Sequence, residues 1–261
     1  MAQIQNIPTQ FLPRLSNGAA DALLRSSDLT IAQDGQLRVA YAPFDHVTPS
    51  AQLVIVGITP GETQAVKAIQ EAQSALQAGA SEAEVLARAK VHASFSGPMR
   101  ANLIAMLDAV GVGTYFNLRS SADLFTNSSD YVQFTSALRY PVFRNGKNYN
   151  GVPSMLRTPI LRKMLDAYLA EEVRQLPTAL WLPLGPKANE ALRYLTNQGL
   201  LNPELVLSGL PHPSGANAER IAVFVGRKAS EAASRQTNGA ALVDARHRLS
   251  AQIARLKGDI Q

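Results

Sequence analysis

Apolar and polar positions follow two different patterns along the chain. Near the N-terminus, LTIAQDGQLRVAYAP (29–43) contains two alternating runs joined by Asp34-Gly35, a dipeptide typical of a two-residue hairpin turn. The nearly continuous apolar run QLVIVG (52–57) instead predicts a strand buried on both faces, as in a parallel sheet. We therefore expect residues 1–50 to form an N-terminal extension with a β-hairpin. Residues 51–261 are expected to form the main domain, including a C-terminal helical extension.

Most of the chain alternates strand-like and helix-like segments. Apolar runs predict further strands at 131–138, 178–185 and 205–210. Helices are expected at 19–25, 62–79, 98–112 and 153–176, from residue 186, and through most of the sequence after 217. Gly79 is the expected C-cap of the helix at 62–79, and a Ser81/Glu84 capping box predicts the start of another helix. The helix at 153–176 is expected to break before Pro159. This alternation indicates an α/β fold. We expect a three-layer α/β/α sandwich with a central, mainly parallel four-stranded sheet.

The composition is that of a folded protein and excludes several kinds of site. Hydrophobic residues make up 46% of the chain and charged residues 17%. Cysteine is absent, which excludes disulfides, cysteine-ligated iron–sulfur clusters, thiolate zinc sites and a cysteine nucleophile. The histidines offer no pair at metal-ligand spacing; they are His46, His92, His212 and His247. We therefore expect neither a metal nor another cofactor.

Hydropathy and charge also bear on location and partners. The N-terminal MAQIQNIPTQFLPRL lacks the apolar stretch of a signal peptide, and no segment approaches the roughly 18 apolar residues of a membrane span. We expect a cytoplasmic protein with no membrane partner. A net charge of +5 and a pI of about 9.6 suit a polyanionic partner.

Two loops follow predicted core strands and carry the candidate chemistry. GITPGE (57–62) follows the first core strand, and HPSGAN (212–217) follows the last. In open parallel sheets, ligands bind at the carboxyl ends of the strands. Both loops are therefore expected to face the same end of the sheet.

With these loops the chain resembles the uracil-DNA glycosylase superfamily. Members of that superfamily carry a G-x-x-P-G-like loop after the first strand and an H-P-S loop after the last strand of a small α/β/α sandwich. The matching positions here are Gly57, Pro60, Gly61, His212, Pro213 and Ser214. FSGPMRANL (95–103) and FTSALRYP (134–141) resemble the segments that stack on and recognise the base, so the resemblance covers roughly 52–226. It implies a monofunctional, monomeric DNA glycosylase that leaves an abasic site in DNA.

The resemblance also implies roles for individual residues. His212 would hydrogen-bond the departing base. Ser214 and the backbone at Gly215 would contact phosphates beside a flipped nucleotide. Asn217 would either help to bind phosphate or act as a helix N-cap. Phe95 would stack on the base, or else be an ordinary core aromatic residue.

The first loop departs from the superfamily pattern. Members that remove uracil place an acidic or amide side chain at its second or third position to orient water, where this chain has Ile58 and Thr59. Ile58 cannot orient water and is expected to contact the base, whereas Thr59 can form only a weak hydrogen bond to water. Glu62 is the nearest carboxylate; it is either a favourable charge in the first turn of a helix or a displaced water-orienting group. Thr59 and Glu62 therefore join His212 as candidate catalytic residues.

The predicted strand at 131–138 also departs from the superfamily pattern. Where relatives that read uracil have Thr-Asn, this chain has Thr135-Ser136, and a serine hydroxyl matches the uracil edge poorly. Ser136 is therefore expected to read another base, a damaged or modified pyrimidine. A bulky modified cytosine of phage DNA is one candidate, which would make the protein an antiviral enzyme. The alternatives are a conventional uracil-DNA glycosylase in base-excision repair and a catalytically inactive DNA-binding member.

A third alternative is an unrelated nucleotide-handling α/β enzyme that uses TPGET (59–63) as a phosphate-binding turn. The absence of a G-x-G-x-x-G motif and of a Walker lysine motif argues against it. Nucleotide binding without DNA affinity would favour it.

A basic stretch offers a DNA-binding surface. No acidic residue occurs between Tyr131 and Leu165, and this stretch interleaves basic residues with aromatic ones. Its candidate phosphate contacts are Arg139, Arg144 and Lys147. The alternative is a solvated surface loop that lacks acidic residues by chance.

Overall fold

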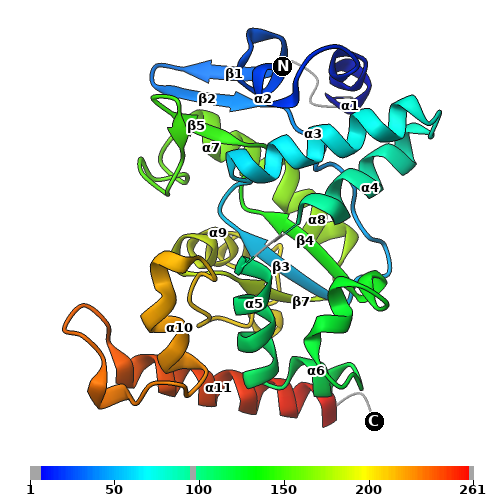
Figure 1. Cartoon of the computed structure of the whole chain (residues 1–261). Helices are drawn as coiled ribbons and strands as arrows, with labels where there is room; N and C mark the ends of the chain where they lie inside the picture. Colours follow the sequence, from blue (N-terminus) through cyan, green and yellow to red (C-terminus); the bar gives the residue numbers. More distant parts are fainter. Residues whose placement is uncertain (1–6, 95–97, 259–261) are drawn as a thin grey trace.

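The structure, a computed structural model, describes residues 7–94 and 98–258 (Figure 1). The strands are β1 (Thr30–Asp34), β2 (Leu37–Ala40), β3 (Leu53–Gly57), β4 (Val132–Ser136), β5 (Val142–Arg144), β6 (Lys147–Asn148) and β7 (Leu180–Pro183). The α-helices are α1 (Ile7–Phe11), α2 (Ala20–Arg25), α3 (Glu62–Gln77), α4 (Glu82–Ala93), α5 (Pro98–Ala109), α6 (Val112–Tyr115), α7 (Pro159–Met164), α8 (Ala170–Gln175), α9 (Pro186–Asn197), α10 (Ala218–Phe224) and α11 (Gly239–Gly258). A π-helical segment, Leu165–Leu169, joins α7 to α8.

A parallel sheet has the strand order β4–β3–β7. Its register places Gly57 opposite Ser136 and Val56 opposite Pro183. The carboxyl ends of all three strands therefore lie at one edge, which is the edge where the first loop leaves β3.

The fourth strand expected in this sheet, 205–210, does not form. Val206 makes one parallel bridge to Trp181, and the Leu207 N–H donates to the Trp181 carbonyl at 2.8 Å. Gly209 then adopts a φ of +135°, outside the range of a strand, and beyond it the Gly185 N–H donates to the Leu210 carbonyl at 3.0 Å without a strand forming. The prediction of one four-stranded, mainly parallel sheet is wrong, because the parallel sheet has three strands and the second sheet is antiparallel.

The antiparallel sheet has the order β1–β2–β5–β6. The predicted N-terminal hairpin is confirmed, with Asp34 paired to Leu37 across the turn. β2 pairs in turn with β5, so the N-terminal segment shares a sheet with a distant part of the chain. The basic segment expected to be a loop is thus partly a hairpin, with Asn145 at a φ of +50° and Gly146 in its turn.

The N-terminal segment also shares a hydrophobic core with the rest of the molecule. Leu15, Leu24 and Tyr41 are fully buried in the core that contains Val54 and Ile69. Residues 7–50 are therefore an integral part of the body rather than an attachment to it (Figure 1).

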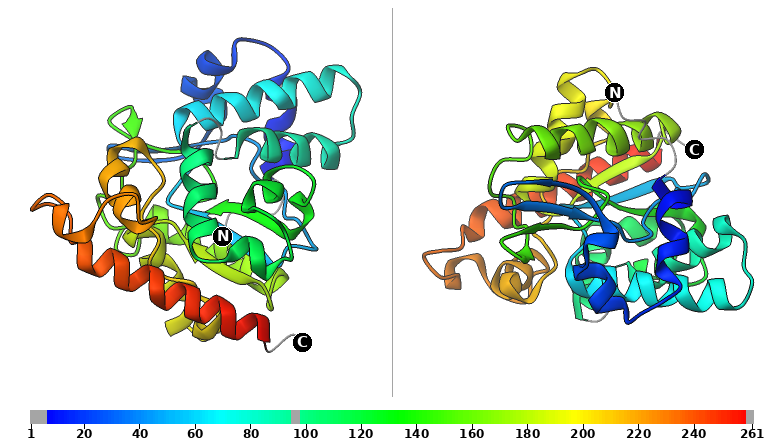
Figure 2. Two further views of the ribbon diagram at one scale, coloured as in Figure 1. Left: turned by 60° about the horizontal axis from the view of Figure 1, so that its bottom comes forward. Right: turned by 90° about the horizontal axis from the view of Figure 1, so that it is seen from above.

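Strand β3 separates two cores. Val54 and Val56 belong to one core, with residues of α3, α4, α7, α8 and α9. Leu53 and Ile55 belong to the other, with residues of α5, α10 and α11. Figure 2 shows α3 and α4 side by side and α11 on the far side of the molecule. The predicted α/β class is confirmed, and helices cover both faces of the parallel sheet.

Candidate functional site

A cavity of about 490 Å³ lies where β3, β4 and β7 end. Its lining includes 57–61 from the first loop and His212, Ser214 and Asn217 from the second loop. Ser136, the last residue of β4, lines it as well. The structure therefore brings the two loops singled out by the sequence to one common space.

Thr59 fastens the first loop to the segment before β5. Its hydroxyl donates to the Tyr140 carbonyl at 3.0 Å and accepts from the Val142 N–H at 3.1 Å. The hydroxyl proton is therefore engaged by the backbone. Thr59 lines the cavity but can offer a ligand or a water molecule only an acceptor lone pair.

Glu62 turns away from the cavity, contrary to a water-orienting role. One of its carboxylate oxygens accepts from Nε and Nη2 of Arg25 at 3.0 and 2.8 Å. Its backbone N–H donates to Oδ1 of Asn148, and its side chain is absent from the cavity lining. Glu62 is the first residue of α3, where its charge also suits the helix dipole. Within the described part of the chain, no carboxylate lines the cavity.

His212 is held in one tautomer by its own loop. The Ser214 N–H donates to Nδ1 of His212 at 3.2 Å, which leaves Nε2 as the protonated nitrogen of a neutral ring. Burial lowers the pKa of His212 below its ordinary value. At neutral pH the cavity therefore contains an uncharged imidazole with one N–H to donate.

The rest of the second loop forms a chain of side-chain hydrogen bonds. Arg220 Nη1 donates to Oδ1 of Asn217 at 2.8 Å, and Nδ2 of Asn217 donates to Oγ of Ser214 at 3.1 Å. Asn217 does not cap α10 with its side chain, so it supports Ser214 instead. The Ser214 hydroxyl proton has no acceptor among the described residues, and Gly215 beside it is exposed.

Only some of the residues expected to contact the base lie among the described residues. Ile58 lines the cavity, and its carbonyl accepts from the Leu138 N–H at 2.9 Å. The Ser136 hydroxyl makes no hydrogen bond with the described residues, so it can meet a ligand. Phe95, the expected stacking residue, lies outside the described residues. Aromatic residues of the described part that line the cavity are Phe44, Phe134 and Tyr149.

The three basic candidates occupy different environments. Arg144 and Lys147 are exposed on the β5–β6 hairpin, where a DNA backbone can reach them, and neither lines the cavity. Arg139 is not on the surface, because its Nη2 and Nε bind Oε1 of Glu172 at 2.8 and 3.1 Å and its side chain is only 12% exposed. The expectation of a surface phosphate contact is therefore wrong for Arg139, which lines the cavity from within.

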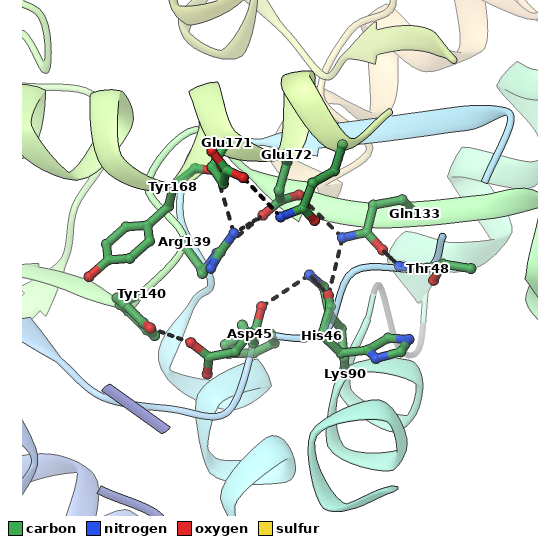
Figure 3. A network of polar contacts seen from close by, with 12 residues as sticks. Asp45, His46, Thr48, Lys90, Gln133, Arg139, Tyr140, Tyr168, Glu171 and Glu172 are labelled. Carbon is green, nitrogen blue, oxygen red and sulfur yellow. Dashed lines mark hydrogen bonds and ion pairs between the residues drawn. The ribbon is translucent and has the colours of Figure 1, made fainter. Parts of the chain in front are cut away.

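Lys90 lines the cavity beside this buried ion pair (Figure 3). Lys90 lies in the last turn of α4 and is only 4% exposed. Its Nζ donates to the carbonyls of Phe44 at 3.0 Å and His46 at 2.6 Å. Burial lowers the pKa of Lys90 to about 8.

A buried polar network supports these two cations (Figure 3). Gln133 Nε2 donates to Oε2 of Glu172 and to the His46 carbonyl, both at 3.2 Å. Burial raises the pKa of Glu172, but Lys90 and Arg139 outweigh this effect and hold the pKa below its usual range. Glu172 is therefore ionised and balances part of the positive charge.

Asp45 completes the network on the side of the N-terminal segment. Its carboxyl group accepts from the Tyr140 hydroxyl, and burial raises the pKa of Asp45 above its usual value. Asp45 does not line the cavity. The charge that the cavity meets at this wall is therefore that of Lys90 and Arg139.

Sequence reasoning misses several cavity residues. Lys90 has a weak signal, since it falls on the same helix face as Leu86 and Ala93, which are both at least partly buried. Phe44 and Lys187 stand in no recognisable motif. They reach the cavity only because the N-terminal segment and α9 fold onto it.

Two kinds of feature are absent from the described part of the chain. Within residues 7–94 and 98–258, no helix is both long and apolar enough to cross a membrane. The same residues contain no group of three or more His, Asp or Glu side chains placed to hold a metal ion.

Comparison with known proteins links the chain to a relative in Bacillus. No protein-family model matches the sequence. No solved structure shows significant similarity to it. The chain is 36% identical over 225 residues to "Uncharacterized protein YoxB" of Bacillus subtilis (strain 168), a match that covers 85% of this chain and 87% of the relative. At this identity and coverage, the chain belongs to the same family as YoxB of Bacillus subtilis.

Proposed function

We propose that this protein is a DNA glycosylase, related in plan to the uracil-DNA glycosylases, that excises a non-standard pyrimidine. One observation carries the proposal: the G-x-x-P-G-like loop and the H-P-S loop line the same cavity, and His212 offers a donor there. The finer fold that goes with this proposal is an α/β/α sandwich around the parallel sheet.

The cavity suits a base that has left the duplex. An enzyme that acts on a base flips the nucleotide into a pocket and reads it by stacking and by edge contacts. Phe44, Phe134 and Tyr149 provide aromatic surface for stacking, and the Ser136 hydroxyl provides one edge contact. The Ser214 hydroxyl, at the edge of the second loop, is available for a flanking phosphate.

The chemistry would be hydrolysis of the N-glycosidic bond. Water adds to C1′ of the sugar while the bond to the base breaks, and the bonding electron pair leaves with the base. The Nε2–H of His212 would donate to the base as its negative charge develops. The proton lost by the water is finally taken up by the base, which gives a free base and an abasic site.

The lack of a cavity carboxylate shapes this reaction. No Asp or Glu lines the cavity in the described part of the chain, so water would be positioned by neutral groups such as the remaining lone pair of Thr59. The same observation favours a second candidate function, a DNA-binding module that holds a flipped base without cleaving it. Weak general-base assistance predicts slow excision if the chain is an enzyme.

A panel of oligonucleotides separates the two functions. Each oligonucleotide carries one uracil, deaminated purine or modified cytosine, including glucosylated hydroxymethylcytosine, in single- and double-stranded form. Abasic sites are detected as alkali-labile breaks, and the released base is identified by mass spectrometry. A glycosylase releases at least one base, and His212→Ala slows that release by about 10²–10³-fold.

The matched control is His247→Ala, which removes an exposed histidine of α11. This variant should excise at the wild-type rate. Tight binding to one modified DNA with no base released would instead establish the binding module. Equal excision by His212→Ala and by the wild type would remove His212 from the mechanism.

A further inference from the structure

The wall of the cavity formed by Lys90 and Arg139, hereafter the cationic wall, has unused hydrogen-bond donors (Figure 3). Arg139 commits Nε and Nη2 to Glu172, and Nη2 also to the Tyr168 carbonyl at 3.4 Å. Its Nη1 has no acceptor among the described residues. Lys90 uses two of its three N–H groups, on the carbonyls of Phe44 and His46.

The charges of the cationic wall, like its unused donors, favour an anionic ligand. Two cations face the cavity at this wall, whereas Glu172 is the ionised carboxylate directly bound to one of them. Glu172 and Asp45 also attract the Lys90 ammonium through space, but neither lines the cavity, and no other carboxylate of the described residues does. Buried donors are usually satisfied in folded proteins, so a cationic wall with unused donors and no carboxylate on its cavity side is suited to an anionic group from a ligand.

We propose that Lys90 and Arg139 form an anion-binding subsite that receives a carboxylate carried by the base, so the substrate class is a pyrimidine with an acidic substituent. The inference rests on the proposed function, because it assumes that a base occupies the cavity. A guanidinium and an ammonium together provide directed, charge-assisted hydrogen bonds to the two oxygens of a carboxylate. A neutral substituent of the same size leaves these donors poorly matched.

The cationic wall is then what determines specificity, and the two loops perform the chemistry. Lys90 comes from α4 and Arg139 from the segment after β4, so neither belongs to the loops that hold His212 and Thr59. Changing the wall should therefore alter which base is bound more than it alters the handling of the glycosidic bond.

The test compares single-stranded and duplex oligonucleotides that carry one 5-carboxylcytosine, 5-formylcytosine or 5-hydroxymethylcytosine. Binding is measured by fluorescence anisotropy with the His212→Ala variant, so that excision does not consume the DNA. The 5-carboxyl base should bind about tenfold or more tightly than the 5-formyl base, as expected for a hydrogen bond to a charged group. Equal dissociation constants for the two would overturn the proposal, and this comparison requires no change to the cationic wall.

Variants of the wall assign the preference to its residues. Lys90→Met and Arg139→Gln, each combined with His212→Ala, should reduce the preference for the carboxyl base to near unity. Lys90→Arg, which keeps the charge, should retain most of it. Lys163→Met and Arg193→Gln remove exposed charges of α7 and α9 and should leave the preference intact. Circular dichroism checks that the Lys90→Met and Arg139→Gln proteins are folded. If these folded variants keep the preference for the carboxyl base, the assignment is contradicted.

Failure of this inference differs from failure of the proposed function. If neutral modified bases are excised and the carboxyl base is bound no better, the chain is a glycosylase but the anion subsite is absent. If the carboxyl base is bound preferentially and no base is ever released, the subsite stands and the catalytic proposal fails.

Discussion

The cavity has two walls that are built in different ways. The loop wall consists of 57–61, at and after the end of β3, and 212–217, which follows the isolated bridge at Val206. Its side chains are mostly held by backbone groups or near neighbours in sequence. The cationic wall brings together Lys90 and Arg139. Glu172, which binds Arg139, lies 33 residues away from it in the sequence. The loop wall offers neutral donors and acceptors, whereas the cationic wall offers charge. This difference suggests that one wall handles the bond to be broken and the other selects the ligand.

The largest effect is expected when the cationic wall loses its internal counterion. Glu172→Ala leaves the buried Arg139 without its partner, and breaking such a buried pair costs about 3–5 kcal/mol of unfolding free energy. The neighbouring Glu171→Ala removes an exposed carboxylate paired with Arg174 and should cost less than about 1 kcal/mol. Urea denaturation of the two variants checks this. Similar losses in both would mean that the wall is not organised around Glu172.

The loop wall should be less costly to disturb. Thr59→Val removes the hydroxyl that bonds to the Tyr140 carbonyl and the Val142 N–H, which leaves two backbone groups unsatisfied at a cost of about 1–3 kcal/mol. Thr59→Ser keeps the hydroxyl and should retain both stability and excision. Denaturation and excision assays on the pair separate a positioning role from a catalytic one. A Thr59→Val protein of wild-type stability that excises nothing would point to a direct role in the reaction.

The charge on the cationic wall should make ligand binding depend on pH. Lys90, with a pKa of about 8, faces Arg139, Glu172, Asp45 and the partly buried His46, whose pKa is lowered by burial and by Lys90. A lysine binds a carboxylate while it is protonated, so affinity is highest below pH 8 and falls as the pH rises through this value. The protonated fraction drops about tenfold by pH 9. Anisotropy with 5-carboxylcytosine DNA should show this loss in the wild-type wall and a flat profile in Lys90→Met.

A smaller effect is expected at the edge of the loop wall. Ser214→Ala removes one neutral donor proposed to contact a phosphate, which should weaken binding to every DNA by about threefold to tenfold. The preference among bases should not change, because phosphate contacts carry no base information. Ser74→Ala, an exposed position of α3, is the control. A change in base preference with Ser214→Ala would mean that the two walls are not separate in function.

The difference between the walls also explains what the sequence can predict. The Asp34-Gly35 hairpin and β3 follow from local patterns, and the structure agrees with both. The two loops meet as expected, although a single bridge rather than a full strand precedes the second loop. The strand expected at 205–210 fails because one bridge to Trp181 is followed by a glycine outside the β region. An apolar run alone does not reveal where pairing stops.

Side-chain environments set by distant partners could not be predicted. Arg139 lies in a basic stretch that suggests a solvated surface, yet Glu172 on α8 draws it inside. Glu62 is the last residue of the first loop, yet Arg25 from α2 holds its side chain outside the cavity. For both residues, an ion pair with a residue distant in sequence sets the direction of the side chain. The spacing of residues in the local sequence does not predict such a pair.

His212, in a cavity formed by the two loops, is proposed to support release of a base from DNA. The direct measurement is mass-spectrometric detection of free base after the wild-type protein and His212→Ala are incubated with the modified-base panel. We expect the wild type to release at least one non-standard pyrimidine and the variant to release it about 10²–10³-fold more slowly. No free base from any member of the panel, or equal release by both proteins, would contradict it.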